Sequence, residues 1–397
     1  MTQTQSPRPG QQGLGVVGAW ALAGDYVEDI LVATARDVHG AIAKRAFGLT
    51  NKATSGSARG TQALHDGISR AIYTGLGAGV RAASSGLRAA ERRGVGPRLE
   101  QSPRGRFVLA AVNGLVGDRL AHEQPDFAIT MGVRLHGGDV PLGPAHLAAA
   151  YPRATGDLVV FLHGLSENEE YWNRRSEENG GSYAERLNAE TTWTSVMLRA
   201  NTGLPIADNG VALASLLDSL VAGWPTEVER IALVGHSMGG LIMRAACAVE
   251  TDSEVPWNEK VTNVVTLGAP HLGAPIAKTI QMGAAACGHL PESAPFGRIL
   301  EYRSVGILNL RGGLAPDVRA LPRARYHLVA ATLGRSHRHL VSEVFGDMLV
   351  RYPSATGRPR RGREMFPGAD VLHVPGAGHF DLLNHRDVYA AMKGWLG

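Results

Sequence analysis

The clearest chemical signal in the chain is a serine held between glycines, in the sequence G-H-S-M-G at residues 235–239. The apolar run at 231–234 predicts a buried strand before it, and the apolar stretch from Leu241 predicts a helix after it. G-x-S-x-G at a strand-to-helix turn is the pattern of a nucleophile elbow, where glycines permit a turn too tight for a Cβ and the serine hydroxyl is presented. We therefore predict that Ser237 is a catalytic nucleophile. The alternative is an ordinary glycine-rich turn.

A serine hydroxyl needs a neighbouring base, because it is a weak nucleophile at its own pKa. His379, in P-G-A-G-H-F at 375–380, follows the last predicted strand, where an imidazole can lean back over the strand ends. It has the best context of the 15 histidines and is our candidate base. The alternative is a histidine that caps the helix beginning near Asn384.

The base in turn needs a carboxylate that fixes its tautomer and stabilises the imidazolium. Asp347, in G-D-M-L-V at 346–350, follows the preceding predicted strand and lies before His379. The order along the chain is then Ser, Asp, His, as in hydrolases with this kind of elbow. Three other carboxylates are weaker candidates: Asp370, which opens the last strand and so belongs at the other end of the sheet, Asp381 and Glu343.

An attacked ester also needs hydrogen-bond donors for its developing oxyanion, and the loss of one donor costs about a hundredfold or more in rate. We predict that the backbone N–H of Met238, directly after the nucleophile, is one donor. The second is the N–H of Leu165, in the H-G-L sequence that follows the predicted strand at 158–162. His163 is interpreted as a hydrogen-bonding brace of that loop rather than a proton carrier.

Acidic and aromatic residues follow the second predicted donor, in S-E-N-E-E-Y-W at 166–172. A run of charges of this kind usually forms a solvated loop. We expect that here, with Tyr171 or Trp172 lining the mouth of the site.

Strands must alternate with helices to bring these residues together. Apolar runs predict buried strands at 158–162, 194–198, 231–234, 261–267, 326–331 and 371–374, and helical patterns are clearest at 206–222, 239–250 and 384–396. The segment 127–135 alternates as a half-exposed strand, expected at an antiparallel edge. This alternation predicts an α/β fold with a mostly parallel sheet flanked by helices.

These motifs resemble the α/β-hydrolase superfamily, specifically its bacterial lipase and esterase branch. The resemblance lies in H-G-L at 163–165, G-H-S-M-G-G at 235–240, G-D-M-L-V at 346–350 and G-H-F at 378–380. The sequence G-A-P-H-L-G-A-P at 268–275 also resembles a segment of bacterial lipases and of deacylases that act on lipid anchors. The resemblance covers roughly residues 125 to 397. It implies serine-dependent hydrolysis of carboxylic esters without a cofactor.

The rest of the chain divides by composition. Residues 1–24 are interpreted as a disordered or docking N-terminus, 25–122 as a helical extension, and 123–397 as the catalytic domain, with a cap at 272–325. The extension carries an apolar stripe in which Leu64, Ile68 and Ile72 recur four residues apart. We expect this extension to pack on the catalytic domain. The alternatives are a lipid-surface or granule-docking face and an oligomer interface.

Charge and composition argue against several other classes of protein. The net charge of +4 comes mostly from scattered arginines, and the run at 358–363 is expected to be a solvated loop rather than a nucleic-acid patch. Two cysteines are too few for a disulfide framework. The pair His337 and His339 has no nearby carboxylate pattern, so we predict no metal site. No unbroken apolar run reaches the roughly 20 residues that a spanning helix requires.

The apolar segment 14–24 bears on localisation. It ends in A-L-A, which resembles a signal-peptide cleavage site, but it is short, broken by glycine and preceded by a single arginine, Arg8. We therefore expect a docking segment and a cytoplasmic protein, with secretion as the alternative.

The sequence thus predicts a serine carboxylesterase or lipase that uses Ser237, His379 and Asp347 on a small-molecule or lipid ester. The same three residues could serve a thioesterase, an amidase, an acyltransferase or an intracellular polyester depolymerase whose N-terminal helices contact the lipid or granule surface. A non-catalytic lipid-binding scaffold is the last alternative. The oligomeric state is left open.

Overall fold

The structure is a computed structural model of all 397 residues. It describes residues 62–89 in part, 99–250, 256–274, 304–313 without 311, 318, 320–336, 347, 349–359 and 363–397. The chain divides into two compact units. One comprises Met1–Gly105 and Lys278–Arg303, and the other comprises Arg106–Ala277 and Ser304–Gly397.

In the first unit, the described residues between 62 and 89 are helical, and most of them are small or polar and exposed. They include Gly67, Ala71 and Ala78. The residues of the predicted apolar stripe, residues 25–61 of the expected helical extension and the N-terminal segment 1–24 lie outside the described residues.

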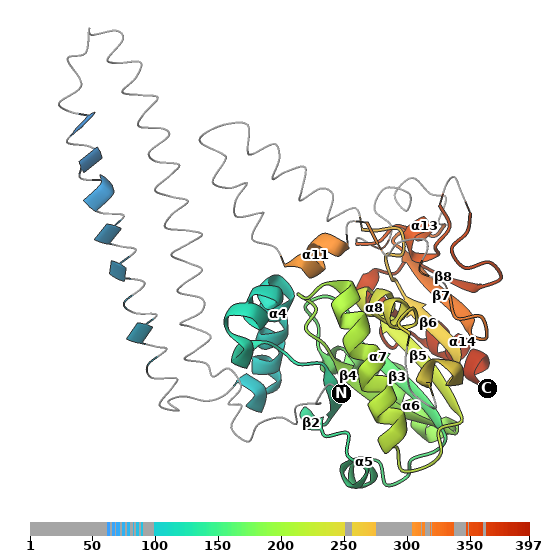
Figure 1. The fold of residues 1–397 in the computed structure, drawn as a ribbon. Coiled ribbons are helices and arrows are strands. Elements are labelled where there is room, and N and C mark those ends of the chain that lie inside the picture. The colour runs from blue at the N-terminus through green and yellow to red at the C-terminus, as the bar shows by residue number, and fades with distance from the viewer. Residues whose placement is uncertain are drawn as a thin grey trace. The chain divides into compact units, whose positions relative to one another are not determined.

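The second unit is built on one sheet of eight strands in the order β2-β1-β4-β3-β5-β6-β7-β8, shown in Figure 1. The strands are β1 (Gly132–Leu135), β2 (Gly138–Val140), β3 (Asp157–Leu162), β4 (Trp193–Arg199), β5 (Arg230–His236), β6 (Val261–Leu267), β7 (Arg325–Thr332) and β8 (Asp370–Pro375). From β4 to β8 all neighbours pair in parallel. The predicted α/β fold with a mostly parallel sheet is therefore confirmed.

The antiparallel part of the sheet differs in detail from the prediction at 127–135. The strand β1 is shorter than expected because Pro125–Phe127 forms a 3-10 helix, η3. It pairs antiparallel with both β2 and β4, so it lies one strand inside the edge. The edge strand β2 follows a turn in which His136 and Gly137 have positive φ. Its exposed, charged sequence carried no hydrophobic alternation by which it could be predicted.

Helices cover both faces of the sheet, and each face forms its own core. On one face α7 (Ile206–Gly223) and α8 (Met238–Ala246) pack against Leu158, Val160 and Leu162 of β3. On the other, α6 (Tyr183–Glu190) and α14 (Arg386–Leu396) join a cluster that contains Val159 and Phe161. Successive side chains of a strand point to opposite faces, so a strand covered on both sides must be apolar throughout. The all-buried β3 shows this.

The helix α7 has the length and mean hydropathy of a membrane span, the one such helix among the described residues. Half of that window is buried within the protein, and Leu213, Leu217 and Leu220 are fully buried in the core. A core helix meets the same criteria of length and apolar composition.

The helix α4 (Pro103–Glu123) packs on the unit that contains the sheet. The Asn113 side chain accepts a hydrogen bond from the Ile129 N–H at 2.8 Å, and the Asn201 amide donates to the Gly117 carbonyl at 3.0 Å. The Ser304 hydroxyl donates to the Gly114 carbonyl before α11 (Val305–Asn309) begins. Most of α4 therefore lies within the second unit, whereas we expected a boundary near residue 122.

The remaining short elements are α5 (Pro144–Ala150), α13 (Tyr352–Ala355), η2 (Leu99–Gln101), η4 (Glu169–Asn173), η5 (Glu177–Asn179), η6 (Trp257–Lys260) and η7 (His379–Leu382).

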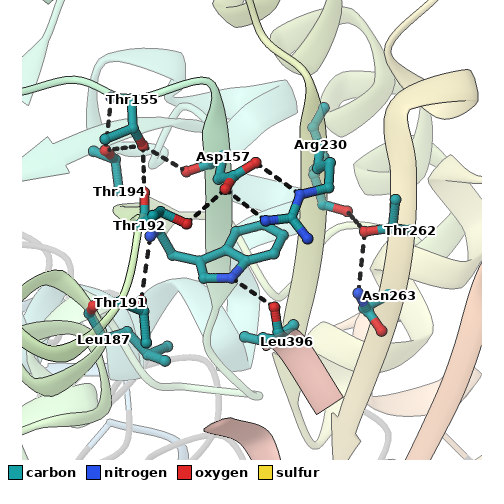
Figure 2. Close-up of polar contacts among 12 residues, drawn as sticks. Thr155, Asp157, Leu187, Thr191, Thr192, Thr194, Arg230, Thr262, Asn263 and Leu396 are labelled. Atoms are coloured by element: carbon teal, nitrogen blue, oxygen red, sulfur yellow. Dashed lines mark hydrogen bonds and ion pairs between the residues drawn. The ribbon is translucent and has the colours of Figure 1, made fainter. Parts of the chain in front are cut away.

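A polar cluster closes the end of the sheet where the parallel strands begin (Figure 2). The Arg230 guanidinium donates to both oxygens of the Asp157 carboxylate, at 2.8 and 2.6 Å. The Thr192 hydroxyl donates to the same carboxylate at 2.7 Å. Arg230 also lies over the Trp193 ring, whose Nε1–H donates to the Leu396 carbonyl at the end of α14. The cluster thus joins the starts of β3, β4 and β5 to the last helix.

We predict that Asp157→Asn lowers the free energy of unfolding by about 1–2 kcal/mol at neutral pH, since it removes a charged, bidentate pair whose arginine is partly exposed. The hydrogen bonds from Arg230, more than the opposing burial, hold the pKa of Asp157 below its ordinary value. The stabilisation is then present above the ordinary aspartate pKa and is lost as the pH falls through the lowered folded-state pKa. Urea unfolding of both proteins at neutral and acidic pH measures this.

The exposed Asp126 provides the matched control, and Asp126→Asn should change the unfolding free energy little. A destabilisation of Asp157→Asn that is as large in strong acid as at neutral pH would contradict the role of the charge.

Candidate active site

The backbone at Ser237 adopts a conformation that side chains other than glycine rarely take. Its φ is 51° and its ψ is −121°, and it lies between the last residue of β5 and the first of α8. Such a conformation costs on the order of 1–3 kcal/mol and persists only where the surroundings enforce it. Here the Ser237 N–H donates to the Leu267 carbonyl at the end of β6, at 2.8 Å. The strained turn expected of a nucleophile elbow is present.

Two glycines let the elbow fit between its neighbours. A Cβ at Gly235 would lie 2.5 Å from the Gly240 nitrogen, and a Cβ at Gly239 would lie 2.4 Å from the Leu162 carbonyl oxygen. No real Cβ approaches backbone that closely, so both positions require glycine. The spacing of glycines around Ser237 therefore reflects how tightly α8 crosses the ends of β3 and β5.

The candidate base and acid form a buried pair at the same end of the sheet. His379 Nδ1 lies 2.7 Å from Asp347 Oδ2, and the two residues are 3% and 1% exposed. The other carboxylate oxygen, Oδ1, accepts the N–H groups of Leu349 and Val350 at 2.9 and 2.7 Å. These bonds fix the carboxylate, so Nδ1 carries the proton and Nε2 is left to accept one.

Contacts with the ends of two strands bring the imidazole beside the elbow. A Cβ built on Gly268, the residue after the Leu267 that binds the Ser237 N–H, would lie 3.1 Å from His379 Nδ1. The rings of His379 and His236, the residue before the nucleophile, are 4.8 Å apart. Ser237 is partly exposed, and its hydroxyl makes no hydrogen bond with another described residue. The contact between a nucleophile and its base is often long before substrate binds.

The two predicted oxyanion donors belong to two segments that adjoin the serine. The Met238 N–H belongs to the first turn of α8, where helix amides have no acceptor within the helix. The Leu165 N–H has no acceptor among the described residues, whereas its neighbours Gly164 and Ser166 donate to Glu167 and Thr202. A Cβ on Gly164 would lie 2.9 Å from the Ser237 Cβ, so this loop touches the nucleophile. Both assignments remain predictions.

The acidic segment after Leu165 is buried rather than solvated, which corrects the expectation from sequence. Each of its glutamates pairs with a basic side chain from a different element: Glu167 with His236 of β5, Glu169 with Arg134 of β1, and Glu170 with Arg106 of α4. Sequence reasoning could not assign these pairs, because the partners lie 35 to 69 residues away along the chain.

The two aromatic residues of the same segment have different positions. Trp172 is 1% exposed and packs in the core against Phe161, so it does not line the mouth of the site as expected. Tyr171 is partly exposed and stacks on Phe107 of α4. Of the two aromatic residues, only Tyr171 therefore remains a candidate for lining the mouth of the site.

Two further buried histidines brace the site. His163 donates from Nδ1 to the Gly164 carbonyl and accepts the Ala200 N–H at Nε2, so it is neutral. Burial lowers its pKa. This arrangement agrees with the predicted bracing role. His271, after β6, contacts the Thr266 hydroxyl at 3.2 Å, and burial lowers its pKa to about 3, so it also stays neutral.

The other candidates from sequence lie elsewhere. Asp370 opens β8 and contacts His327 at 2.9 Å, at the opposite end of the strands from Ser237. Asp381 binds the Gly378 N–H and Arg175. Glu343, His337, His339 and residues 275–303 of the expected cap lie outside the described residues. Within the described part of the chain, no group of three or more His, Cys, Asp or Glu side chains could hold a metal ion.

Residues 153–301 match the protein family described as "Putative serine esterase (DUF676)". The match contains the strands β3 to β6, the elbow and both predicted oxyanion donors. These strands are the centre of an eight-stranded mixed sheet that carries a strained serine at the end of a central strand. The fold is that of an α/β-hydrolase. The superfamily resemblance stated from the motifs is thereby confirmed.

Several solved structures are similar to this chain. A lipase from Bacillus licheniformis, BlEst2 in its propeptide form, matches with 19% identity and a TM-score of 0.44 over 61% of this chain and 51% of that one. The carboxylesterase CesB from Bacillus subtilis matches with 14% identity and a TM-score of 0.37, over 60% and 83%. EstA from Clostridium botulinum matches with 14% identity and a TM-score of 0.39, over 61% and 87%. This chain thus spans about half the length of the Bacillus licheniformis lipase.

If Asp347 orients the base, Asp347→Asn should lower kcat for a chromogenic ester by about 10⁴-fold, because an amide at this position favours the wrong imidazole tautomer. Steady-state kinetics of the purified variant measure this. Asp370→Asn removes a carboxylate from the far end of the same strands and should leave kcat unchanged. Equal losses in both variants would show that Asp347 has no specific role.

Proposed function

We propose that this protein is a carboxylic ester hydrolase that works through an acyl-enzyme on Ser237. The observation that carries the proposal is the conjunction of a strained, partly exposed serine with a buried His379–Asp347 pair at the same end of the sheet. A strained backbone and a buried carboxylate both cost stability, and such costs concentrate at functional sites. The family match over 153–301 supports ester hydrolysis.

In the first step, the Ser237 hydroxyl attacks the ester carbonyl carbon and its proton passes to His379 Nε2. Asp347 accepts the Nδ1–H bond throughout and stabilises the imidazolium that forms. The carbonyl π electrons move to oxygen, so a tetrahedral oxyanion results. The N–H groups of Leu165 and Met238 are proposed to bind that oxyanion.

In the second step, the oxyanion collapses and the carbon–oxygen bond to the alcohol breaks. The His379 imidazolium gives its proton to the departing alkoxide, which leaves an acyl group on Ser237 and a neutral imidazole. A water molecule then attacks the acyl-enzyme with His379 as base, and the carboxylic acid leaves with Ser237 restored. These steps need no cofactor.

The same residues could cleave a thioester or an amide, or could pass the acyl group to an alcohol instead of water. A matched set of ester, thioester and amide substrates with one acyl group separates these outcomes by relative kcat/KM. We expect the ester to have the highest value.

We predict that the protein hydrolyses p-nitrophenyl esters of short or medium chain length in a series from acetate to palmitate. Ser237→Ala should lower the rate at least about a thousandfold, as loss of a triad member does. Release of p-nitrophenol measures the rate. A fluorophosphonate probe should label the native protein and leave Ser237→Ala unlabelled.

The nearby Ser166 also lies in the loop that contacts the elbow, and Ser166→Ala is the matched control, expected to keep both hydrolysis and labelling. A folded native protein that neither hydrolyses these esters nor reacts with the probe would favour a non-catalytic lipid-binding role.

A further inference from the structure

A second buried pair of a histidine and a carboxylate lies beside the candidate catalytic residues and takes no part in the steps above. His236 Nδ1 is 3.0 Å from both oxygens of the Glu167 carboxylate. Glu167 is 3% exposed, and His236 is fully buried. The Glu167 carboxylate also accepts the Gly164 N–H at 2.8 Å.

The partners of His236 define its charge. Nδ1 faces the Glu167 carboxylate, and Nε2 faces the carbonyl oxygen of His379 at 3.4 Å. Both partners are acceptors, which favours a proton on each nitrogen, and only the imidazolium has two N–H donors. His163 is a contrast within the same site, because it has one donor partner and one acceptor partner and fits the neutral ring.

The electrostatic surroundings favour the same charge state. Burial by itself lowers the pKa of His236, but the Glu167 carboxylate, the His379 carbonyl and the more distant Asp347 outweigh it, and the pKa is raised. Burial by itself raises the pKa of Glu167, but His236 and the Gly164 N–H outweigh it, and the pKa is lowered. The rings of Trp172, Phe380 and His379 also lie near the His236 ring.

This pair joins the three backbone segments whose relative positions decide the chemistry. Glu167 binds the amide directly before the Leu165 donor. His236 is the residue directly before Ser237, and its Nε2 holds the backbone of His379. We propose that Glu167 and His236 form a permanently ionised pair that positions the oxyanion-binding loop and the His379 loop around the nucleophile. The positioning role rests on the ester hydrolysis proposed above.

Loss of this pair should affect the transition state more than substrate binding. Neither side chain is proposed to touch the substrate, so KM should change little. A shift of about 1 Å in a positioning group can cost about a hundredfold in rate. We therefore expect Glu167→Gln to lower kcat by about 10- to 100-fold and to change KM less than about threefold, because one amide oxygen cannot replace two carboxylate oxygens.

The matched control is Glu169→Gln. This substitution neutralises another buried glutamate of the same loop, one that pairs with Arg134 of β1 and contacts neither Gly164 nor His236. It should destabilise the fold but keep kcat per folded molecule. If Glu167→Gln is folded and keeps the native kcat, or if both variants lose kcat equally, the positioning role is overturned.

A measurement on the native protein decides the charge state even if Glu167→Gln fails to fold. In protein labelled with ¹⁵N-histidine, the two ring nitrogens of His236 should both show imidazolium shifts from about pH 5 to 8, assigned by comparison with His236→Gln. A neutral His236 at pH 7, near the ordinary histidine pKa of about 6.5, would overturn the ionised pair.

The two proposals can fail separately. Native protein that hydrolyses no ester would overturn the proposed function, and the positioning role with it, while the nitrogen shifts still decide the charge state. Native protein that hydrolyses esters while Glu167→Gln matches it would overturn the positioning role alone.

Discussion

The candidate site depends on the backbone of Ser237, which is held in a strained conformation. Ser237 keeps a φ of 51° because it alone connects β5 to α8 and its N–H is bonded to the end of β6. The free energy for this strain comes from the fully buried strands around it, whose apolar side chains pack into two cores on opposite faces of the sheet. A rigid sheet is therefore needed for chemistry as well as for stability, since a softer support would let the turn relax and withdraw the hydroxyl.

Hydrogen-bonded carboxylates around the elbow fix the orientation of the groups that they contact, which hydrophobic packing alone does not. An apolar contact tolerates small slips, whereas a carboxylate with a fixed donor on each oxygen has one favourable arrangement. Asp347 shows this with two backbone donors on one oxygen and His379 on the other. In the loop after β3, Glu167, Glu169 and Glu170 each contact a basic side chain from a different element. These contacts tie the loop and η4 to β5, β1 and α4.

The sequence was sufficient to predict those elements that depend on residues close to one another along the chain. The six parallel strands, the flanking helices and the turn at Ser237 follow from apolar runs and glycine spacing, which reflect nearby packing. The sequence was insufficient where the position of a side chain depends on a partner that is far away along the chain. The glutamates after Leu165 look like a solvated run until Arg134, His236 and Arg106 are brought to them by the fold. The roles of Ser237, His379 and Asp347 were assigned from motif context, and the buried contact between the last two fits that assignment while leaving their chemistry to experiment.

The packing of α4 has a practical consequence for anyone who shortens this chain. The helix precedes the first strand and looks like part of the extension, yet Asn113 binds the Ile129 backbone and Arg106 holds Glu170 beside the elbow. A fragment that starts at the first strand would lose these bonds and uncover the apolar groups beneath them. A truncation near residue 120 therefore alters the hydrolase unit itself, and any loss of activity would be misread as evidence about the N-terminal segment. A cut placed just before α4 avoids that confusion.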